Sequence, residues 1–324
     1  MAPVPRPTTE ANPAPQLAGG SPVLTVIMVS YNTRELTLTA LATLIANTPG
    51  IGMQLIVVDN ASDDGSSEAV AERFPEVELI ASDSNLGFAA ANNVAAERAQ
   101  GEWLLLLNPD TETFAGSIAS MLDFSRSHPE AGIVGGRTLY PDGTLNPFSC
   151  ANRMTAWSLF CGATGLSRAF PSSPIFNSEQ MGGWQRDTVR HVDIVVGCFF
   201  LVRRELWQEL GGFDTRYFMY GEEADFCLRA AHLGYRPMIT PDAEIMHVVG
   251  ASSTRREDKL IPLMRAKASL VRGHWHKMAV PLGISLLWLW AVLRKLASTA
   301  GLDRQNRPLW TAVWRRRHEW LAGY

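Results

Sequence analysis

Apolar runs that end in polar residues constrain the fold of this chain more than any other feature. Residues 23–30 (VLTVIMVS), 55–60 (LIVVDN) and 103–110 (WLLLLNPD) have the length and continuous hydrophobicity of strands buried on both faces. Helix-like segments, 34–47 and 85–99, lie between them. Because buried strands alternate with helices, the pattern predicts an α/β domain with a mostly parallel central sheet flanked by helices.

The polar ends of these runs predict a ligand site. They carry Ser30-Tyr31-Asn32, Asp59-Asn60 and Asn108-Pro109-Asp110. In open parallel sheets, ligands bind at the carboxyl ends of the strands. Three strand ends that deliver polar groups to one edge therefore indicate a binding site there.

An acidic segment, MYGEEADFCLR at 219–229, predicts a second functional feature. Gly221 and Gly234 suit the start and stop of a helix over 222–233. Helical spacing puts Glu223 on the face of Phe226, Cys227 and Ala230, and puts Glu222, Asp225, Arg229 and His232 on a polar face. Partial desolvation would raise the pKa of Glu223, as a general base requires. The alternatives are acids that only start the helix, and a structural Asp225–Arg229 pair.

The ends of the chain differ from its centre. Residues 1–21 are rich in Pro and Ala and predict a disordered tail. Residues 278–293 are apolar without a charge, short of the roughly 20 residues that span a bilayer, and basic residues lie on both sides. This pattern predicts a globular domain over 22–255 and a C-terminal helical region over 256–324 that lies on an anionic membrane surface. The alternatives are a helix pair packed on the domain and a helix that spans the bilayer.

The totals exclude some functions. The formal net charge of −3 does not suit a nucleic-acid binder. The four cysteines, at 150, 161, 198 and 227, form no CxxC pair, so buried free thiols in a reducing compartment are expected. A GxGxxG fingerprint is absent from the sequence, which disfavours a dinucleotide-binding dehydrogenase.

Over roughly residues 23–255 the chain resembles the inverting family 2 glycosyltransferases with a GT-A fold, in their rhamnosyltransferase-like branch. The ordered set of motifs carries this resemblance, together with His247: VSYN (29–32), VVDNAS (57–62), NLGFAAANN (85–93), LLLNPD (105–110), GGFD (211–214) and YGEEADFC (220–227). The resemblance implies a Rossmann-like sheet, a nucleotide-sugar donor and a divalent cation, Mg²⁺ or Mn²⁺.

The resemblance also implies roles for single residues. Donor-binding residues would be Ser30, Tyr31, Asn32, Asp59, Asn85, Gly87, Asn92 and Asn108. Asp110 would be a metal ligand and His247 a second one. Asn108 stands where many relatives have Asp, which puts a two-carboxylate metal site in doubt. Glu223 fills the position of the catalytic base, usually Asp, and Asp225 is the second candidate.

The implied function is inverting transfer of a sugar, with dTDP-rhamnose favoured as donor, to a hydroxyl of a lipid-linked or cell-envelope glycan. The enzyme would work in the cytoplasm, peripherally on the plasma membrane. Trp157, Phe160, Phe176 and Trp184 would either stack on the acceptor or pack in the core. A sugar nucleotidyltransferase is disfavoured because VSYNTRELT has no glycine-rich loop. The third alternative is an inactive nucleotide-sugar-binding scaffold of the envelope.

Overall fold

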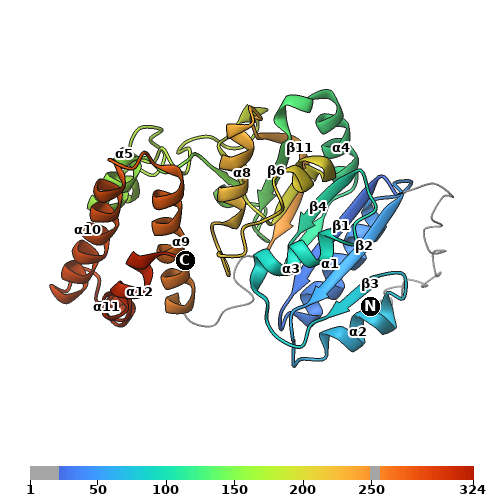
Figure 1. Cartoon of the computed structure of the whole chain (residues 1–324), viewed down its shortest axis with the longest axis horizontal. Helices are drawn as coiled ribbons and strands as arrows, with labels where there is room; N and C mark the ends of the chain where they lie inside the picture. The colour runs from blue at the N-terminus through green and yellow to red at the C-terminus, as the bar shows by residue number, and fades with distance from the viewer. Residues whose placement is uncertain (1–21, 249–255) are drawn as a thin grey trace, which may run out of the picture.

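The computed structural model describes residues 22–248 and 256–324 (Figure 1). The predicted tail at 1–21 lies outside the described residues. The apolar run AEIMHVVGASS (243–253) predicts a further strand, and the end of this run also lies outside the described residues. The strand observed there runs over Met238–His247, so it begins earlier than predicted.

One large mixed sheet forms the centre of the molecule, in the order β3-β2-β1-β4-β10-β6-β11-β5, with β8 paired to β11. Its strands are β1 (Leu24–Ser30), β2 (Met53–Asp59), β3 (Glu78–Ala81), β4 (Trp103–Leu107), β5 (Thr111–Thr113), β6 (Ile133–Leu139), β8 (Arg190–His191), β10 (Phe199–Arg203) and β11 (Met238–His247). A separate small ladder pairs β7 (Cys150–Ala151) with β9 (Ile194–Val195).

The predicted parallel arrangement holds for the first half of the sheet, where β3, β2, β1 and β4 are all parallel. Strand β10 enters between β4 and β6 antiparallel to both. Beyond it β6 and β11 are parallel to each other. The sequence DIVVGCFFLVRR (193–204) predicts a strand that runs into a helix; the helix begins at Arg204 as predicted, but the strand is divided into β9 and β10.

Helices cover both faces of this sheet. They are α1 (Arg34–Asn47), α2 (Ser66–Arg73) and α4 (Ser117–Ser127) on one face, and α3 (Gly87–Ala96), α7 (Arg204–Glu209) and α8 (Glu222–His232) on the other. Along β1, Val26 and Met28 pack in the first core and Ile27 in the second. Because successive side chains point to opposite faces, both of which are covered, the strand is apolar at most positions, with Thr25 and Ser30 as its polar residues.

A second lobe of helices lies beside α8, at the left of Figure 1. It contains α5 (Ala156–Thr164), α6 (Leu166–Ala169), α9 (Arg256–His274), α10 (Val280–Thr299), α11 (Arg307–Arg315) and α12 (Arg317–Ala322). Short 3₁₀ turns complete the chain: η1 (Pro129–Ala131), η2 (Pro147–Ser149) and η3 (Arg304–Asn306). The lobe has its own core, which includes Met264, Leu287, Trp310 and Trp320.

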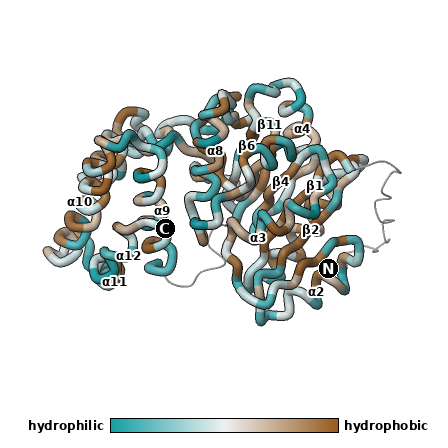
Figure 2. Tube along the Cα trace, in the orientation of Figure 1, coloured by the Kyte–Doolittle hydropathy of each residue, from teal (hydrophilic) through white to brown (hydrophobic). Residues whose placement is uncertain are grey.

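Helix α10 is a long, largely apolar helix of this lobe, as Figure 2 shows. Within the described residues it alone is long and apolar enough to cross a membrane, with a mean hydropathy of 1.5 and 17% of that stretch buried. It is longer than the predicted 278–293 segment because it continues through Arg294 and Lys295. The four cysteines are buried and free, as predicted.

Candidate active site

The polar ends of β1 and β2 lie side by side, as predicted. Ser30 is the register partner of Asp59, and the Asn60 amide donates to the Ser30 carbonyl oxygen over 2.8 Å. Asp59 is buried, and its Oδ1 has no hydrogen-bond partner among the described residues. A buried oxygen without a partner is costly unless a ligand or water completes it, so Asp59 fits a donor-binding role.

Two neighbours of Asp59 differ in what they offer a ligand. The Ser30 hydroxyl lies 3.1 Å from that of Thr33 and 2.9 Å from that of Thr37, so it is engaged inside the fold. Tyr31 is 40% exposed, and Asn32 has a φ of 52° with its Oδ1 accepting from the Asp63 amide. Tyr31 and Asn32, rather than Ser30, therefore present side chains at this edge.

Asn60 ties the end of β2 to the start of α3. Its Nδ2 donates to Asn85 Oδ1 over 3.0 Å, and its Oδ1 accepts from the Leu86 amide over 2.8 Å. Asn85 Oδ1 also accepts from the Gly87 amide. Buried Asn92 donates to the Phe88 carbonyl oxygen, and its Oδ1 is unpaired within the described part of the chain. The sequence placed Asn60 at this polar edge but predicted no role for it, and the structure shows that it connects the two elements.

The two predicted metal ligands meet. His247 Nε2 lies 3.1 Å from Asp110 Oδ1, and their side chains are only 12% and 13% exposed. Strand β5, which the sequence did not predict, follows Asp110 and pairs Thr111 with His247. Asn108 lies before them, and its amide donates to the Cys198 carbonyl oxygen.

These residues fit a divalent cation in part. His247 Nδ1 is buried without a partner in the described residues. Burial lowers the pKa of His247, but neighbouring Cys198 and Asp110 outweigh it and raise the pKa to about 10. Within residues 22–248 and 256–324, no cluster of three or more His, Cys, Asp or Glu side chains forms a metal site. A cation held by Asp110 and His247 would therefore need further oxygens, which a donor diphosphate has.

Glu222 and Glu223 begin α8 as a pair of desolvated acids. Burial raises the pKa of both, and the neighbouring carboxylate adds to the rise for Glu222. Two close carboxylates in a desolvated site favour a neutral form, so the pKa of each lies above its usual value. Glu223 thus has the raised pKa that was predicted, and its neighbour Glu222 has one too.

The predicted division of α8 into a buried and a polar face is wrong for two residues. Glu222 is 3% exposed and Asp225 is 5% exposed. Helix α9 packs over the first turn of α8, where Ala266 fills the space beside Gly221. A second packing partner on the opposite side of the helix buries the face that a single apolar stripe leaves polar.

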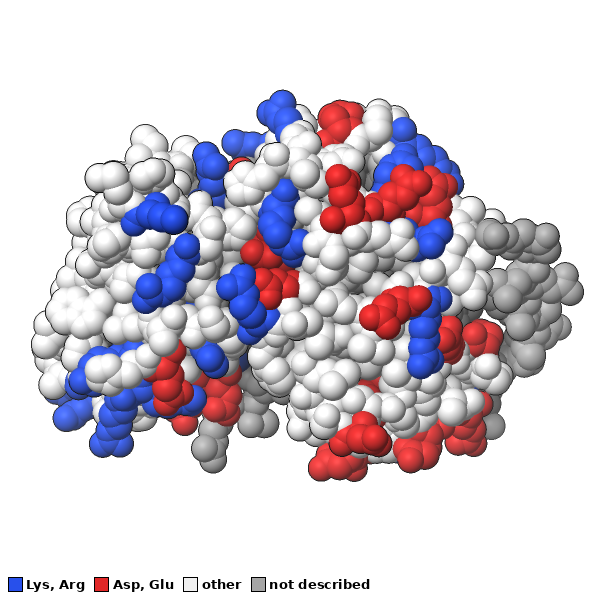
Figure 3. Space-filling view, in the orientation of Figure 1, with Lys and Arg blue, Asp and Glu red and all other residues white. Residues whose placement is uncertain are grey.

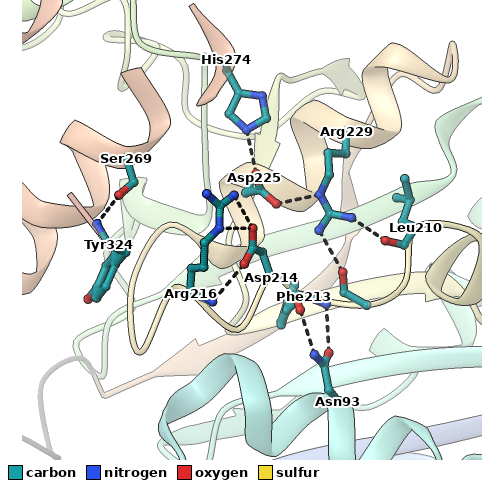
Figure 4. Close-up of polar contacts among 11 residues, drawn as sticks. Asn93, Leu210, Phe213, Asp214, Arg216, Asp225, Arg229, Ser269, His274 and Tyr324 are labelled. Atoms are coloured by element: carbon teal, nitrogen blue, oxygen red, sulfur yellow. Dashed lines mark hydrogen bonds and ion pairs between the residues drawn. The ribbon is translucent and has the colours of Figure 1, made fainter. Parts of the chain in front are cut away.

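Asp225 is held between two bases, as Figure 4 shows. Arg229 Nε lies 2.7 Å from Oδ2, and His274 Nε2 lies 2.8 Å from Oδ1. Burial raises the pKa of Asp225, but the bonds from His274 and Arg229 lower it below its usual value. Arg229 also donates to the carbonyl oxygens of Leu210 and Gly212. His274 was missed because no motif marks it.

A cavity of about 630 Å³ opens beside these acids. Residues of α8, α9 and the segment after β7 line it, including Glu223, Met154, Glu179, Lys267, Leu270 and His274. The aromatic residues expected at an acceptor do not line it; Trp157 is 44% exposed and stacks on Phe160, outside the cavity.

Comparison with known proteins decides the family. Residues 25–211 match the family model described as glycosyl transferase family 2. This chain belongs to glycosyltransferase family 2. The glycosyltransferase is 32% identical over 219 residues to an N-acetylglucosaminyl-diphospho-decaprenol L-rhamnosyltransferase of Mycobacterium tuberculosis. The matched region covers 63% of this chain and 69% of the relative.

Other relatives agree with this assignment. Rhamnosyltransferase WbbL of Escherichia coli is 28% identical, over 60% of this chain and 72% of its own. These two relatives place the glycosyltransferase in the rhamnosyltransferase-like branch. A mannosyltransferase of Pyrobaculum calidifontis, solved with GDP-mannose and Mn²⁺, superposes with a TM-score of 0.55 at 21% identity, over 95% of this chain and 86% of its own. The GT-A fold is thereby confirmed.

Proposed function

We propose that this glycosyltransferase moves rhamnose from dTDP-rhamnose, with inversion, to a hydroxyl of a lipid-linked glycan at the cytoplasmic face of the plasma membrane. The observation that carries the proposal is Glu223, a carboxylate at the start of α8 that lines the cavity and whose pKa is raised by burial. The names of the two rhamnosyltransferases support rhamnose as the sugar, and the decaprenol named for the mycobacterial relative supports a lipid-linked acceptor. The dTDP nucleotide is what the family resemblance implies.

The donor would lie along the carboxyl edge of β1, β2 and β4. Asp59, through its unpaired Oδ1, would accept hydrogen bonds from the ribose or base, with Tyr31 and Asn32 at the exposed side. Asn85, Gly87, Asn92 and Asn108 would surround the diphosphate and sugar. Asp110 and His247 would hold Mg²⁺ or Mn²⁺, which when bound supplies positive charge to stabilise the leaving diphosphate.

Glu223 would then accept the proton of the acceptor hydroxyl. The hydroxyl oxygen forms a bond to the anomeric carbon while the bond from that carbon to the diphosphate oxygen breaks. One in-line displacement inverts the configuration and needs no covalent sugar–enzyme intermediate. Asp225 is already bound by Arg229 and His274, so it would hold the first turn of α8 in position rather than take the proton.

The test of this proposal is the variant Glu223→Gln with dTDP-rhamnose and an N-acetylglucosaminyl-diphosphate lipid. General-base catalysis contributes about 10²–10⁴-fold, so transfer should fall by about that factor while donor binding stays unchanged. The control is Glu209→Gln, the same change at an exposed glutamate of α7, which should keep full activity. Full transfer by Glu223→Gln would exclude it as the base.

A second variant tests the metal ligands. Asp110→Ala should abolish the part of donor binding that depends on added Mn²⁺ or Mg²⁺, as measured by calorimetry. Glu112→Ala, two residues further on in β5, is the control and should bind the donor normally. Metal-dependent donor binding that persists in Asp110→Ala would remove Asp110 from the site, and tight binding without turnover by the wild type would favour the inactive scaffold.

A further inference from the structure

The cavity beside Glu223 continues beyond the reacting groups, along α9 toward α10. We propose that it binds the lipid-linked acceptor along its length, with the sugar at Glu223 and His274 and the beginning of the lipid chain at the turn between α9 and α10. This inference rests on the proposed function, since it assigns the acceptor site of that reaction. A volume of about 630 Å³ is in the range of ligand pockets.

The end of the cavity near α8 suits a polar group. Three of its lining residues have a buried polar atom without a partner among the described residues: Glu223 Oε2, Gln180 Oε1 and His274 Nδ1. The Nε2 atom of His274 is already bound to Asp225, so Nδ1 is the ring atom left for a ligand. Buried polar atoms rarely stay unpaired, and sugar hydroxyls can donate to and accept from all three.

Hydrogen-bond donors along the cavity suit a phosphate group. Its lining residues include two cations, Arg153 and Lys267, and three histidines, His232, His274 and His276. The carboxylates are Glu223 and Glu179, and Glu179 accepts from Lys267 over 2.5 Å. The formal charges of these four side chains cancel, so donors rather than a net charge favour the diphosphate of an acceptor lipid, because Arg153 can donate charge-assisted hydrogen bonds to phosphate oxygens.

The other end of the cavity suits an apolar chain. Its walls beyond His274, the last residue of α9, include Trp275 and then Ala279. Ala279 immediately precedes α10. Met278, just before it, is 86% exposed, and Leu282, in the first turn of α10, is 52% exposed. A lipid chain that leaves the cavity here would pass onto a surface that is already apolar, so the second lobe provides the lipid end of the site.

The test compares two synthetic acceptors with the same N-acetylglucosaminyl-diphosphate head, one on a short alkyl chain and one on a long prenyl chain. The wild type should have a KM about tenfold lower for the prenyl acceptor, which corresponds to ~1.4 kcal/mol. Ala279→Trp narrows the apolar end and should abolish this difference without changing the KM for the donor or for the short acceptor. Ala279 belongs to none of the core clusters, so this substitution removes no side chain from those cores.

The matched control is Ala300→Trp, the same substitution at an exposed position after α10 that does not line the cavity. It should retain the preference for the prenyl chain. A second variant, Ala279→Leu, should reduce the preference if Ala279→Trp fails to fold. Equal KM values for both acceptors in the wild type, or an unchanged preference in both cavity variants, would overturn the inference. If neither acceptor is glycosylated although the donor is bound, the proposed function itself fails.

Discussion

At the scale of single residues, Asp225 shows how a candidate base becomes a structural anchor. Its carboxylate accepts from Arg229 on its own helix and from His274 on α9, and its side chain is 7% exposed. Removing one partner of a buried charge cluster leaves the others uncompensated, which costs more than the cluster contributes. Asp225 therefore connects the first turn of the catalytic helix to the second lobe.

We expect Asp225→Asn to lower the free energy of unfolding by roughly 2–4 kcal/mol at neutral pH. The pKa of Asp225 is lowered in the folded protein, so its stabilising contribution is full above the unfolded pKa of about 3.9 and is lost as pH falls below it. Urea unfolding at neutral and acid pH measures both effects. The difference between variant and wild type should shrink as the pH falls below about 4.

Asp123→Asn is the control for this prediction. Asp123 pairs with Arg126 on the surface of α4, and its side chain is 75% exposed. Its loss should change stability by less than about 0.5 kcal/mol. A cost for Asp225→Asn as small as that of this surface change would show that the Asp225 cluster contributes nothing to folding.

At the scale of elements, the start of α3 depends on a close approach between two chain segments. Gly87 has a φ of 80°, and a Cβ atom there would lie 2.3 Å from the Phe218 carbonyl oxygen. The Phe88 amide donates to that same oxygen over 2.9 Å. The Asn-Leu-Gly turn is therefore bound to the loop that leads into Glu222 and Glu223.

We expect Gly87→Ala to be strongly destabilising, by more than the roughly 1–2 kcal/mol that a left-handed conformation costs an L-residue. The control is Gly50→Ala, which has a φ of 78° but open space around the added Cβ atom. It should show only the cost of the left-handed conformation. Denaturant unfolding of both variants separates this cost from that of the clash with Phe218. An equal loss of unfolding free energy in the two variants would mean that the loop at Phe218 moves aside freely.

The same elements show what sequence could predict. Strands β1, β2 and β4 were recognisable because a strand buried on both faces is apolar throughout. Asp110 and His247 could be paired only through the resemblance, since β5 is too short to show a pattern. Glu222 and His274 were misjudged or missed because α9 packs onto α8 from far along the chain, and helical periodicity describes one neighbour at a time.

At the scale of the whole molecule, the second lobe has an uneven surface. Figure 3 shows that it is largely uncharged, with Lys and Arg gathered at its lower edge, where α11 and α12 lie in Figure 1. Helix α10 keeps Leu282, Trp288 and Leu296 between 43% and 59% exposed. It packs against α5, where Trp157 and Phe160 are also exposed. Exposed apolar groups beside basic residues are typical of a surface that meets anionic lipids.

We therefore expect the full chain to float with vesicles that contain anionic phosphatidylglycerol and to bind purely zwitterionic vesicles less well. Added salt should weaken the binding, because each basic residue near the surface contributes about 1 kcal/mol that ions screen. The double variant Leu282→Asp, Leu296→Asp should lose binding at all salt concentrations, because it places charge where acyl chains would lie. The control Leu233→Asp, at an exposed leucine after α8, should float like the wild type.

If the double variant also floats like the wild type, α10 does not contact the bilayer. If binding instead survives both high salt and alkaline extraction, the helix spans the bilayer rather than lying on it, and the lipid chain of the acceptor would then meet the protein inside the membrane.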